Sequence, residues 1–187
     1  MGLILDSVVI LVSLSGITLA IDDCCSISRQ RALESFRQDV STRVNSAVLV
    51  LFETSQPYRG RRYYLSKPLG NADINRSQAM CLLIGGYLAE IDDAAEYLFV
   101  KSFIRGYSGF FAVYTGGNDE AQEGAWVYRY SGKPVTYLDW TPGQPTNDID
   151  GDCLTYLDRT DWKMDDFRCM YTGNDTRFVC EVPDSRV

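Results

Sequence analysis

Apolar residues recur at helical spacing through residues 26–54, a stretch that contains no Pro or Gly. Successive apolar positions are separated by seven, four, three and four residues, which predicts one amphipathic helix. The spacing is close to the heptad of a coiled coil, interrupted by Arg37, so the helix is either an oligomerising stalk or a helix packed on its own domain. The apolar positions are Leu33, Val40, Val44, Ala47 and Leu51.

A linker at residues 55–60, which contains Pro and Gly, separates this helix from a region with two shorter helices. Asp73 can cap the first of these, and Gly85-Gly86 ends it. The second is expected to begin at Asp92-Asp93 and to stop at Gly106. The expected inward-facing residues are Ile74, Ser77 and Cys81 in the first helix, and Tyr97, Leu98 and Phe103 in the second.

The remaining apolar segments predict strands, and together with the two helices they indicate an α+β fold. Between the fourth and fifth strands, residues 131–152 are rich in Pro, Gly, Asn and Asp. An irregular loop of this length in a compact domain usually has a function. The expected strands cover residues 62–65, 87–91, 110–114, 125–130, 153–157, 162–166 and 177–181.

Composition and charge narrow the possible functions. The chain is 45% hydrophobic and 23% charged, which is typical of a globular protein. Its 18 basic and 25 acidic side chains give a net charge of −7, so a nucleic-acid partner is not expected. The chain has no histidine, which excludes Ser-His-Asp and Cys-His catalysis and histidine zinc sites. Any metal must be held by oxygen atoms, which favours calcium.

Residues 1–20 are typical of a secretory signal peptide, with an apolar segment at 8–14 and small side chains at Thr18 and Ala20 before the cleavage point. The alternative is an uncleaved anchor, because the first residues lack Lys or Arg and include Asp6. The apolar segment is shorter than the ~20 residues that cross a bilayer, so we expect secretion and no membrane span.

Secretion favours disulfide bonds among the six cysteines. Cys24 and Cys25 are adjacent, and a bond between adjacent residues closes a strained ring, so these two are candidates for interchain bonds. The chain is therefore expected to form a disulfide-linked homo-oligomer, most simply a dimer. The other four cysteines allow three pairings, which spacing alone does not distinguish: Cys81, Cys153, Cys169 and Cys180.

Five local motifs follow one another along the chain: Leu88-Ala89-Glu90-Ile91, Glu123-Gly124-Ala125-Trp126, Trp140-Thr141-Pro142-Gly143-Gln144-Pro145, Asp152-Cys153 and Asp166-Phe167-Arg168-Cys169. These motifs and the order of elements resemble the C-type lectin-like domain over residues 61–183, with secreted perlucin-like lectins of molluscs as the most similar subgroup. The resemblance implies bonds Cys81–Cys180 and Cys153–Cys169. The expected organisation is a signal peptide (1–20), a helical stalk with linker (21–60), the lectin-like domain (61–183) and a tail (184–187).

In this family a calcium ion binds sugar hydroxyls directly, so the resemblance implies a calcium site in the long loop. Pro145 would be the cis residue that directs its two neighbours toward the metal. Thr146 replaces a stronger ligand, and Gly151 stands where the family usually has Glu, so the neighbouring Asp150 is the substitute. The implied ligands of the carbohydrate-binding calcium are Gln144, Thr146, Asp150, Asp165 and Asp166.

A second calcium site is implied at Asp119, Glu123, Asn147 and Asp152. Carboxylate and amide oxygens are the ligands that calcium prefers. The alternative is an acidic loop that is simply solvated, in which the carboxylates repel one another. Gln-Pro in the motif favours galactose-type glycans, by resemblance, and Trp140, Tyr137 or Trp162 could stack on the sugar unless they pack in the core.

The leading interpretation is a secreted, calcium-dependent carbohydrate-binding lectin. The alternative is a calcium-independent module with a lectin fold that binds a protein or a mineral surface. An enzyme is not expected, because no nucleophile and base are paired and the adjacent Asp165 and Asp166 should point to opposite faces of a strand. Two sequons predict exposed N-glycosylation sites at Asn75 and Asn174.

Overall fold

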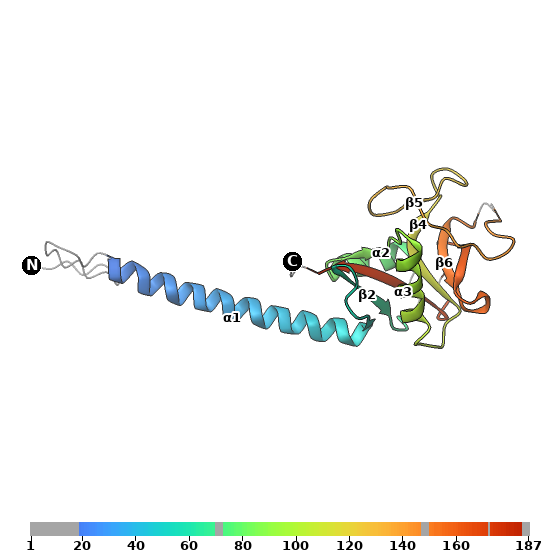
Figure 1. Cartoon of the computed structure of the whole chain (residues 1–187). Coiled ribbons are helices and arrows are strands. Elements are labelled where there is room, and N and C mark those ends of the chain that lie inside the picture. The colour runs from blue at the N-terminus through green and yellow to red at the C-terminus, as the bar shows by residue number, and fades with distance from the viewer. Residues whose placement is uncertain (1–18, 70–72, 147–149, 172, 185–187) are drawn as a thin grey trace, which may run out of the picture. The chain divides into compact units, whose positions relative to one another are not determined.

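The computed structural model describes residues 19–69, 73–146, 150–171 and 173–184, with side chains from residue 26 onward (Figure 1). The predicted signal peptide therefore lies almost entirely outside the described residues. The chain divides into two compact units, residues 1–45 and 46–187. Within the described residues, no helix has the length and apolar character needed to cross a membrane.

Helix α1 (Leu19–Leu51) is longer at its start and shorter at its end than the sequence predicts. Residues 52–54 were expected to continue the helix, but they form strand β1 (Phe52–Thr54), which pairs with β2 (Arg61–Ser66). The reason is burial: the Phe52 ring is 1% exposed and packs edge-on against Tyr64 and Phe178. Tertiary packing of this one ring outweighs helical continuation.

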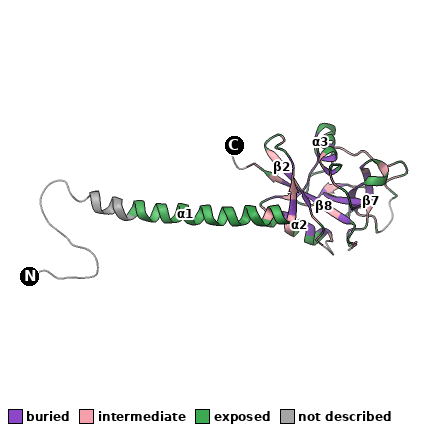
Figure 2. Ribbon diagram, turned by 90° about the horizontal axis from the view of Figure 1, so that it is seen from below, coloured by how far each residue is buried: buried purple, intermediate pink, exposed green. Residues whose placement is uncertain are grey.

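The described strands form one mixed sheet in the order β1-β2-β8-β4-β6-β7, with β3 on β8 and β5 on β4. All pairs are antiparallel except β4 with β8, which the sequence did not predict. The purple strands in Figure 2 show that this sheet is the buried centre of the domain. The other strands are β3 (Tyr87–Leu88), β4 (Ala112–Asn118), β5 (Val127–Tyr128), β6 (Cys153–Leu157), β7 (Lys163–Phe167) and β8 (Thr176–Pro183).

Both short helices begin at the aspartates that the sequence indicates. Asp73 accepts a hydrogen bond from the backbone N–H of Arg76 at 2.8 Å and caps α2 (Ile74–Leu83). Asp93 accepts one from Glu96 at 2.9 Å and caps α3 (Ala94–Ile104). The expected core faces are confirmed except at Leu98, which is 57% exposed because the buried face of α3 follows Tyr97, Val100 and Ile104.

Two disulfide bonds link the helical side of the domain to its sheet and close the base of the long loop. Cys81 on α2 is bonded to Cys180 on β8, and Cys153 on β6 is bonded to Cys169, which follows β7. These are the two pairs that the family resemblance implies. The long loop between β5 and β6 is further attached to β7 by a bridge between Trp140 and Met164.

Candidate functional site

The loop segment Gln144-Pro145-Thr146 lies directly against β7. The Gln144–Pro145 peptide bond is cis. The Gln144 side-chain amide donates to Asp165 Oδ2 at 3.0 Å. Both the backbone N–H and the hydroxyl of Thr146 donate to Asp166 Oδ2, at 2.6 and 2.8 Å. The structure therefore brings four of the five residues expected around the carbohydrate-binding calcium into one site.

Three buried oxygen atoms near this loop have no hydrogen-bond partner. Eight buried side-chain nitrogen or oxygen atoms of the described residues lack one. Only three of these eight are carboxylate or amide oxygens, which can accept but not donate. They are Asp119 Oδ1, Gln144 Oε1 and Asp166 Oδ1, and all three belong to the predicted calcium ligands.

Asp119 anchors the predicted second site at the end of β4. Its side chain is 2% exposed, and its Oδ2 accepts from the Gly124 N–H at 2.8 Å. Its own backbone N–H donates to the carbonyl of Asp152 at 3.1 Å, which joins β4 to the start of β6. Glu123 lies in the turn between β4 and β5. Asn147, the fourth predicted ligand, lies outside the described residues.

The carboxylates around these two sites disfavour one another's charge. Burial raises the pKa of Asp119, and the charges of Asp152 and Asp166 raise it further, against the Gly124 hydrogen bond. The pKa of Glu123 is raised by desolvation and then by Asp119, Asp152 and Asp166. Burial likewise raises the pKa of Asp165. We refer to Asp119, Glu123, Gln144, Asp152, Asp165 and Asp166 as the loop oxygen set.

Asp150 is the fifth expected ligand of the first site. It lines a concavity of about 570 Å³ together with Asp152, Glu120, Arg168 and Tyr171. Among the contacts of the described residues, none joins Asp150 to Gln144, Asp165 or Asp166. The expectation that Asp150 supplies the metal ligand that Gly151 lacks therefore remains a prediction.

The aromatic candidates for sugar stacking differ in burial. Trp162 is 7% exposed and packs on Phe110 with ring centroids 5.3 Å apart, so it is a core residue and the stacking role considered for it is wrong. Trp140 is half-buried and packs edge-on against Trp126 at 5.1 Å. Tyr137 is also half-buried and contacts Tyr97.

The loop oxygen set fits a hard cation by its chemistry. It supplies carboxylate and amide oxygens. Three of its carboxylate residues are buried, two on β7 and one directly after β4, and three of its oxygens lack donors. Within the part of the chain that is described, no three acidic or cysteine side chains form a ready-made metal cluster. A metal at this site would therefore take Gln144 as a ligand and complete its coordination from residues beyond the carboxylates.

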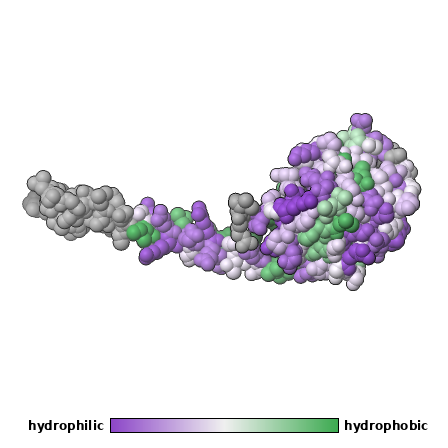
Figure 3. Space-filling model, in the orientation of Figure 1, coloured by the Kyte–Doolittle hydropathy of each residue, from purple (hydrophilic) through white to green (hydrophobic). Residues whose placement is uncertain are grey.

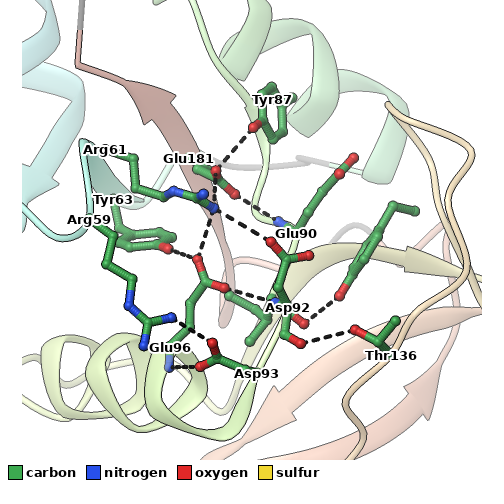
Figure 4. Close-up of polar contacts among 12 residues, drawn as sticks. Arg59, Arg61, Tyr63, Tyr87, Glu90, Asp92, Asp93, Glu96, Thr136 and Glu181 are labelled. Atoms are coloured by element: carbon green, nitrogen blue, oxygen red, sulfur yellow. Dashed lines mark hydrogen bonds and ion pairs between the residues drawn. The ribbon is translucent and has the colours of Figure 1, made fainter. Parts of the chain in front are cut away.

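A second buried acidic cluster, which no sequence motif indicated, joins residues of β2, β3, α3 and β8 (Figure 4). Arg61 Nη1 is 2.7 Å from Glu181 Oε1 and 3.0 Å from Glu96 Oε1. The hydroxyl of Tyr63 donates to Glu96, and that of Tyr87 donates to Glu181 at 3.0 Å. These five residues are called the Arg61 cluster.

The remaining oxygens of the Arg61 cluster accept from backbone groups. Glu181 Oε2 accepts from the Glu90 N–H at 3.2 Å, and Glu96 Oε2 accepts from the Asp92 N–H at 2.8 Å. Burial raises the pKa of Glu181 to about 7, although Arg61, the Glu90 N–H and Tyr87 lower it. Glu90 in turn accepts from the Ser131 N–H at 2.9 Å, so the cluster supports the first residue of the long loop.

Comparison with known proteins places the described domain among lectin-like proteins. A family model described as the lectin C-type domain matches residues 71–182. The sequence is 31% identical over 105 residues to a mannose-binding protein of Gallus gallus, covering 56% of this chain and 38% of that protein. It is 29% identical over 90 residues to a perlucin-like protein of Mytilus galloprovincialis, covering 48% and 58%.

A third relative is the galactose-specific lectin nattectin of Thalassophryne nattereri, which is 33% identical over 81 residues, or 43% of this chain and 50% of that protein. The chain spans about 40–50% of the length of the first relatives that it matches, 38% in one and 52% in another. The alignments therefore describe the domain and not a whole protein.

Solved structures share the fold. The domain is similar to human lithostathine, with a TM-score of 0.61 at 27% identity over 70% of this chain and 88% of that chain. It is also similar to a calcium-independent type II antifreeze protein, with a TM-score of 0.57 at 24% identity over 70% and 96%. The second likeness establishes the fold alone.

Proposed function

We propose that this chain, which belongs to the C-type lectin domain family, is a secreted calcium-dependent lectin that binds galactose-like glycans. The observation that carries the proposal is the set of three buried acceptor oxygens without donors, Asp119 Oδ1, Gln144 Oε1 and Asp166 Oδ1. A buried oxygen that accepts no hydrogen bond lowers stability unless a cation or a water molecule satisfies it.

Each residue of the site has a defined part in this proposal. Gln144, Asp165 and Asp166 would hold the carbohydrate-binding calcium. Asp119, Glu123 and Asp152, which do not form a metal cluster among the described residues, would come together with Asn147 around a second ion that fixes the loop to β4 and β6. Bound calcium supplies positively charged coordination positions that sugar hydroxyls can fill. The hydrogen bonds from Gln144 and Thr146 keep the two carboxylates of β7 in place before any ligand binds.

Galactose preference is supported by the Gln-Pro sequence at positions 144 and 145 and by one relative whose name states galactose specificity. Another relative is named for mannose binding. Half-buried Tyr137 and Trp140 remain the candidates for contact with the apolar face of a sugar ring.

The test is retention on immobilised galactose and on a glycan array, with calcium and with EDTA. We expect retention only with calcium, and its loss in Asp166→Ala. Asp158→Ala removes an exposed carboxylate near the end of β6 and is the matched control that should bind normally. Binding that is unchanged by EDTA, or that survives in Asp166→Ala, would contradict the proposal.

The alternative function is a calcium-independent module that binds a protein or a mineral surface. One observation favours it: Thr146 uses its N–H and hydroxyl to donate to Asp166 Oδ2, which partly satisfies that carboxylate without a metal. Partner binding that persists in EDTA, together with no glycan retention under any condition, would support this alternative.

The proposed secretion implies two further properties, removal of the signal peptide and N-glycosylation. We propose cleavage of residues 1–20 and N-glycans at Asn75 and Asn174, both of which are exposed in the structure. Mass spectrometry of the secreted chain before and after enzymatic removal of N-glycans would test both. A chain that begins at Met1, or that loses no mass on deglycosylation, would contradict this assignment.

A further inference from the structure

The concavity of about 570 Å³ shares Asp152 with the loop oxygen set. One side is lined by Asp150 and Asp152, which precede β6, and the other by Arg168 and Tyr171, which follow β7. Sites that bind small ligands are concave and usually measure about 300–1,000 Å³. The volume is therefore sufficient for a sugar residue. We refer to this hollow as the Arg168 concavity.

The two sides of the Arg168 concavity are linked covalently. Cys153 follows Asp152 in the chain, Cys169 follows Arg168, and these two cysteines form a disulfide bond. The backbone on both sides is therefore fixed before any ligand binds. A site fixed in this way loses less conformational entropy when its ligand binds.

The Tyr171 ring is also held in place. It packs edge-on against Phe111 and Phe167, with ring centroids 6.0 and 5.3 Å away. Its hydroxyl donates to Asp175 Oδ1 at 3.0 Å, and the residue is half-buried. An ordered tyrosine ring offers an apolar surface next to polar groups, which suits the C–H face of a sugar ring.

Met170 lines the same hollow and is 64% exposed. Exposed hydrophobic side chains also occur elsewhere on the domain, and Figure 3 shows hydrophobic areas among hydrophilic ones on its visible face. Exposure of one apolar side chain therefore does not indicate a site. The Arg168 concavity differs because its apolar groups lie beside charged groups on a fixed backbone.

Two of the acidic residues of the Arg168 concavity have partners outside it or face a predicted metal site. Glu120 forms an ion pair with Arg129. The charge of Asp152 contributes to the raised pKa of Asp119 and of Glu123, so Asp152 lies toward the predicted second calcium. Neither carboxylate is therefore an uncompensated charge once that calcium is bound.

The remaining charged residues of the concavity are one acid and one base. Among the ion pairs of the described residues, none involves Asp150 or Arg168. A guanidinium can only donate hydrogen bonds and a carboxylate can only accept them, whereas a sugar hydroxyl does both. An ionic ligand would be attracted by one side and repelled by the other. The lining therefore favours an uncharged ligand rich in hydroxyl groups.

The Arg168 concavity is close to the predicted carbohydrate-binding calcium. Arg168 is two positions after Asp166, so their Cα atoms are at most about 7 Å apart. A sugar residue linked directly to a sugar at Asp166 can span such a distance. The position therefore suits the next residue of the same glycan.

We propose that the Arg168 concavity binds an uncharged sugar residue linked to the one that calcium would hold, so that this chain recognises an oligosaccharide and not a single terminal sugar. Arg168 donates to oxygens of this second residue, Asp150 accepts from its hydroxyls, and Tyr171 packs on its apolar face. The inference rests on the proposed function, because the terminal sugar must first bind at the loop oxygen set.

The first experiment compares methyl galactoside with galactose-terminated disaccharides by isothermal titration of the full secreted chain in calcium. The panel joins galactose to glucose through different linkages, and to glucuronic acid. At least one galactosyl-glucose should bind about tenfold more tightly than methyl galactoside, which is the gain from one hydrogen bond to a charged group.

The outcomes separate this inference from the proposed function. Methyl galactoside binding without a gain from any disaccharide would overturn this inference alone. A gain confined to the glucuronic acid disaccharide would overturn the uncharged ligand class. Absence of calcium-dependent binding of methyl galactoside would contradict the proposed function, and this inference with it.

The second experiment measures the ratio of disaccharide to monosaccharide affinity in variants, which cancels any change in calcium binding. Arg168→Ala should bring the ratio to within about twofold of one and leave methyl galactoside affinity unchanged. Arg159→Ala removes another exposed arginine, between β6 and β7, and should keep the wild-type ratio. A wild-type ratio in Arg168→Ala would overturn the proposal. Tyr171→Ala should also lower the ratio and Tyr171→Phe should keep it, and a lowered ratio in Tyr171→Phe would contradict the role of the ring.

Discussion

Two acidic regions of the lectin domain are built from the same residue types and differ in how their charge is balanced. In the Arg61 cluster, both buried carboxylates accept hydrogen bonds on each oxygen, from a guanidinium, two phenols and two backbone N–H groups. In the loop oxygen set, three buried acceptor oxygens have no donor, and burial together with neighbouring carboxylates raises the pKa of Asp119 and Glu123.

The comparison shows that a cluster of buried carboxylate side chains does not by itself indicate a metal site. Glu96 and Glu181 are as buried as Asp119, with exposures of 2%, 1% and 2%. Arg61 occupies the place between its two carboxylates that an external cation would otherwise fill. What distinguishes a candidate cation site from a self-balanced cluster is a deficit of donors, and of these two described regions only the loop oxygen set has that deficit.

The largest expected effect is from removing the internal cation. Arg61→Ala leaves two buried carboxylates without their shared charge partner, which should lower the free energy of unfolding by about 3–5 kcal/mol. Arg62→Ala is the matched control, because Arg62 is adjacent and its Nη1 makes only a 3.3 Å hydrogen bond to the Ser55 carbonyl. Urea unfolding measures the free energy of unfolding of both variants. A loss below about 1 kcal/mol in Arg61→Ala would show that the two carboxylates stay buried without their cationic partner.

The next effect is a pH dependence specific to the Arg61 cluster. Because burial raises the pKa of Glu181 from 4.5 to about 7, the folded protein binds this proton more tightly than the unfolded chain. The resulting stability is fully present below pH 4.5 and is lost as the pH rises through 7, amounting to up to about 3 kcal/mol.

Unfolding curves from pH 5 to pH 8 in EDTA should show this loss, with EDTA removing any contribution of calcium. The inflection near pH 7 should disappear in Glu181→Gln and persist in Glu34→Gln, which changes an exposed residue of α1. An inflection that survives in Glu181→Gln would assign the proton to another group.

Calcium should stabilise the protein through the loop oxygen set and not through the Arg61 cluster. At a concentration of 100 times Kd, binding adds about 2.7 kcal/mol, which corresponds to roughly 5–10 °C in Tm. The shift should vanish in the Asp119→Asn/Asp166→Asn double variant and remain in Glu181→Gln. Scanning calorimetry with millimolar calcium or EDTA provides the measurement, and a shift that disappears in Glu181→Gln would reverse the assignment of the two regions.

The smallest effect concerns Thr146, which is a donor where the family has a stronger ligand. Thr146→Asp replaces the hydroxyl that donates to Asp166 with a negative charge, so without calcium the variant should lose about 1 kcal/mol. With calcium it should bind the ion roughly tenfold more tightly, as followed by isothermal titration. Thr146→Val removes the hydrogen bond without adding charge, and an equal gain of affinity in Thr146→Val would rule out a role for the added carboxylate.

Much of the fold follows from local signals in the sequence. Asp73 and Asp93 predict the starts of α2 and α3 because a helix leaves its first N–H groups without partners, and residues 153–157 are a strand as expected. Strand β1 and the parallel pairing of β4 with β8 were not predicted, since both depend on contacts between distant segments.

Only the part of the candidate site that lies within the recognised motifs was predictable from the sequence. Gln144, Thr146, Asp165 and Asp166 come together as the resemblance implies, because the motif fixes their spacing. The Arg61 cluster joins residues from β2, β3, α3 and β8 that are up to 120 positions apart, from Arg61 to Glu181, and no local pattern links them. Glu96 and Glu181 each have apolar neighbours in the sequence. An acidic residue within an apolar segment could have predicted a buried carboxylate.

The pairing of β2 with β8 has a consequence for how this domain can be combined with others. Arg61 lies opposite Pro183 in the register, and the Asp184 N–H donates to the Gly60 carbonyl at 2.7 Å, so the segment from residue 60 to residue 184 begins and ends at one place. A segment whose ends meet can be inserted into a surface loop of another protein without stretching either one. The same module can therefore be carried at the end of a chain or spliced into its middle.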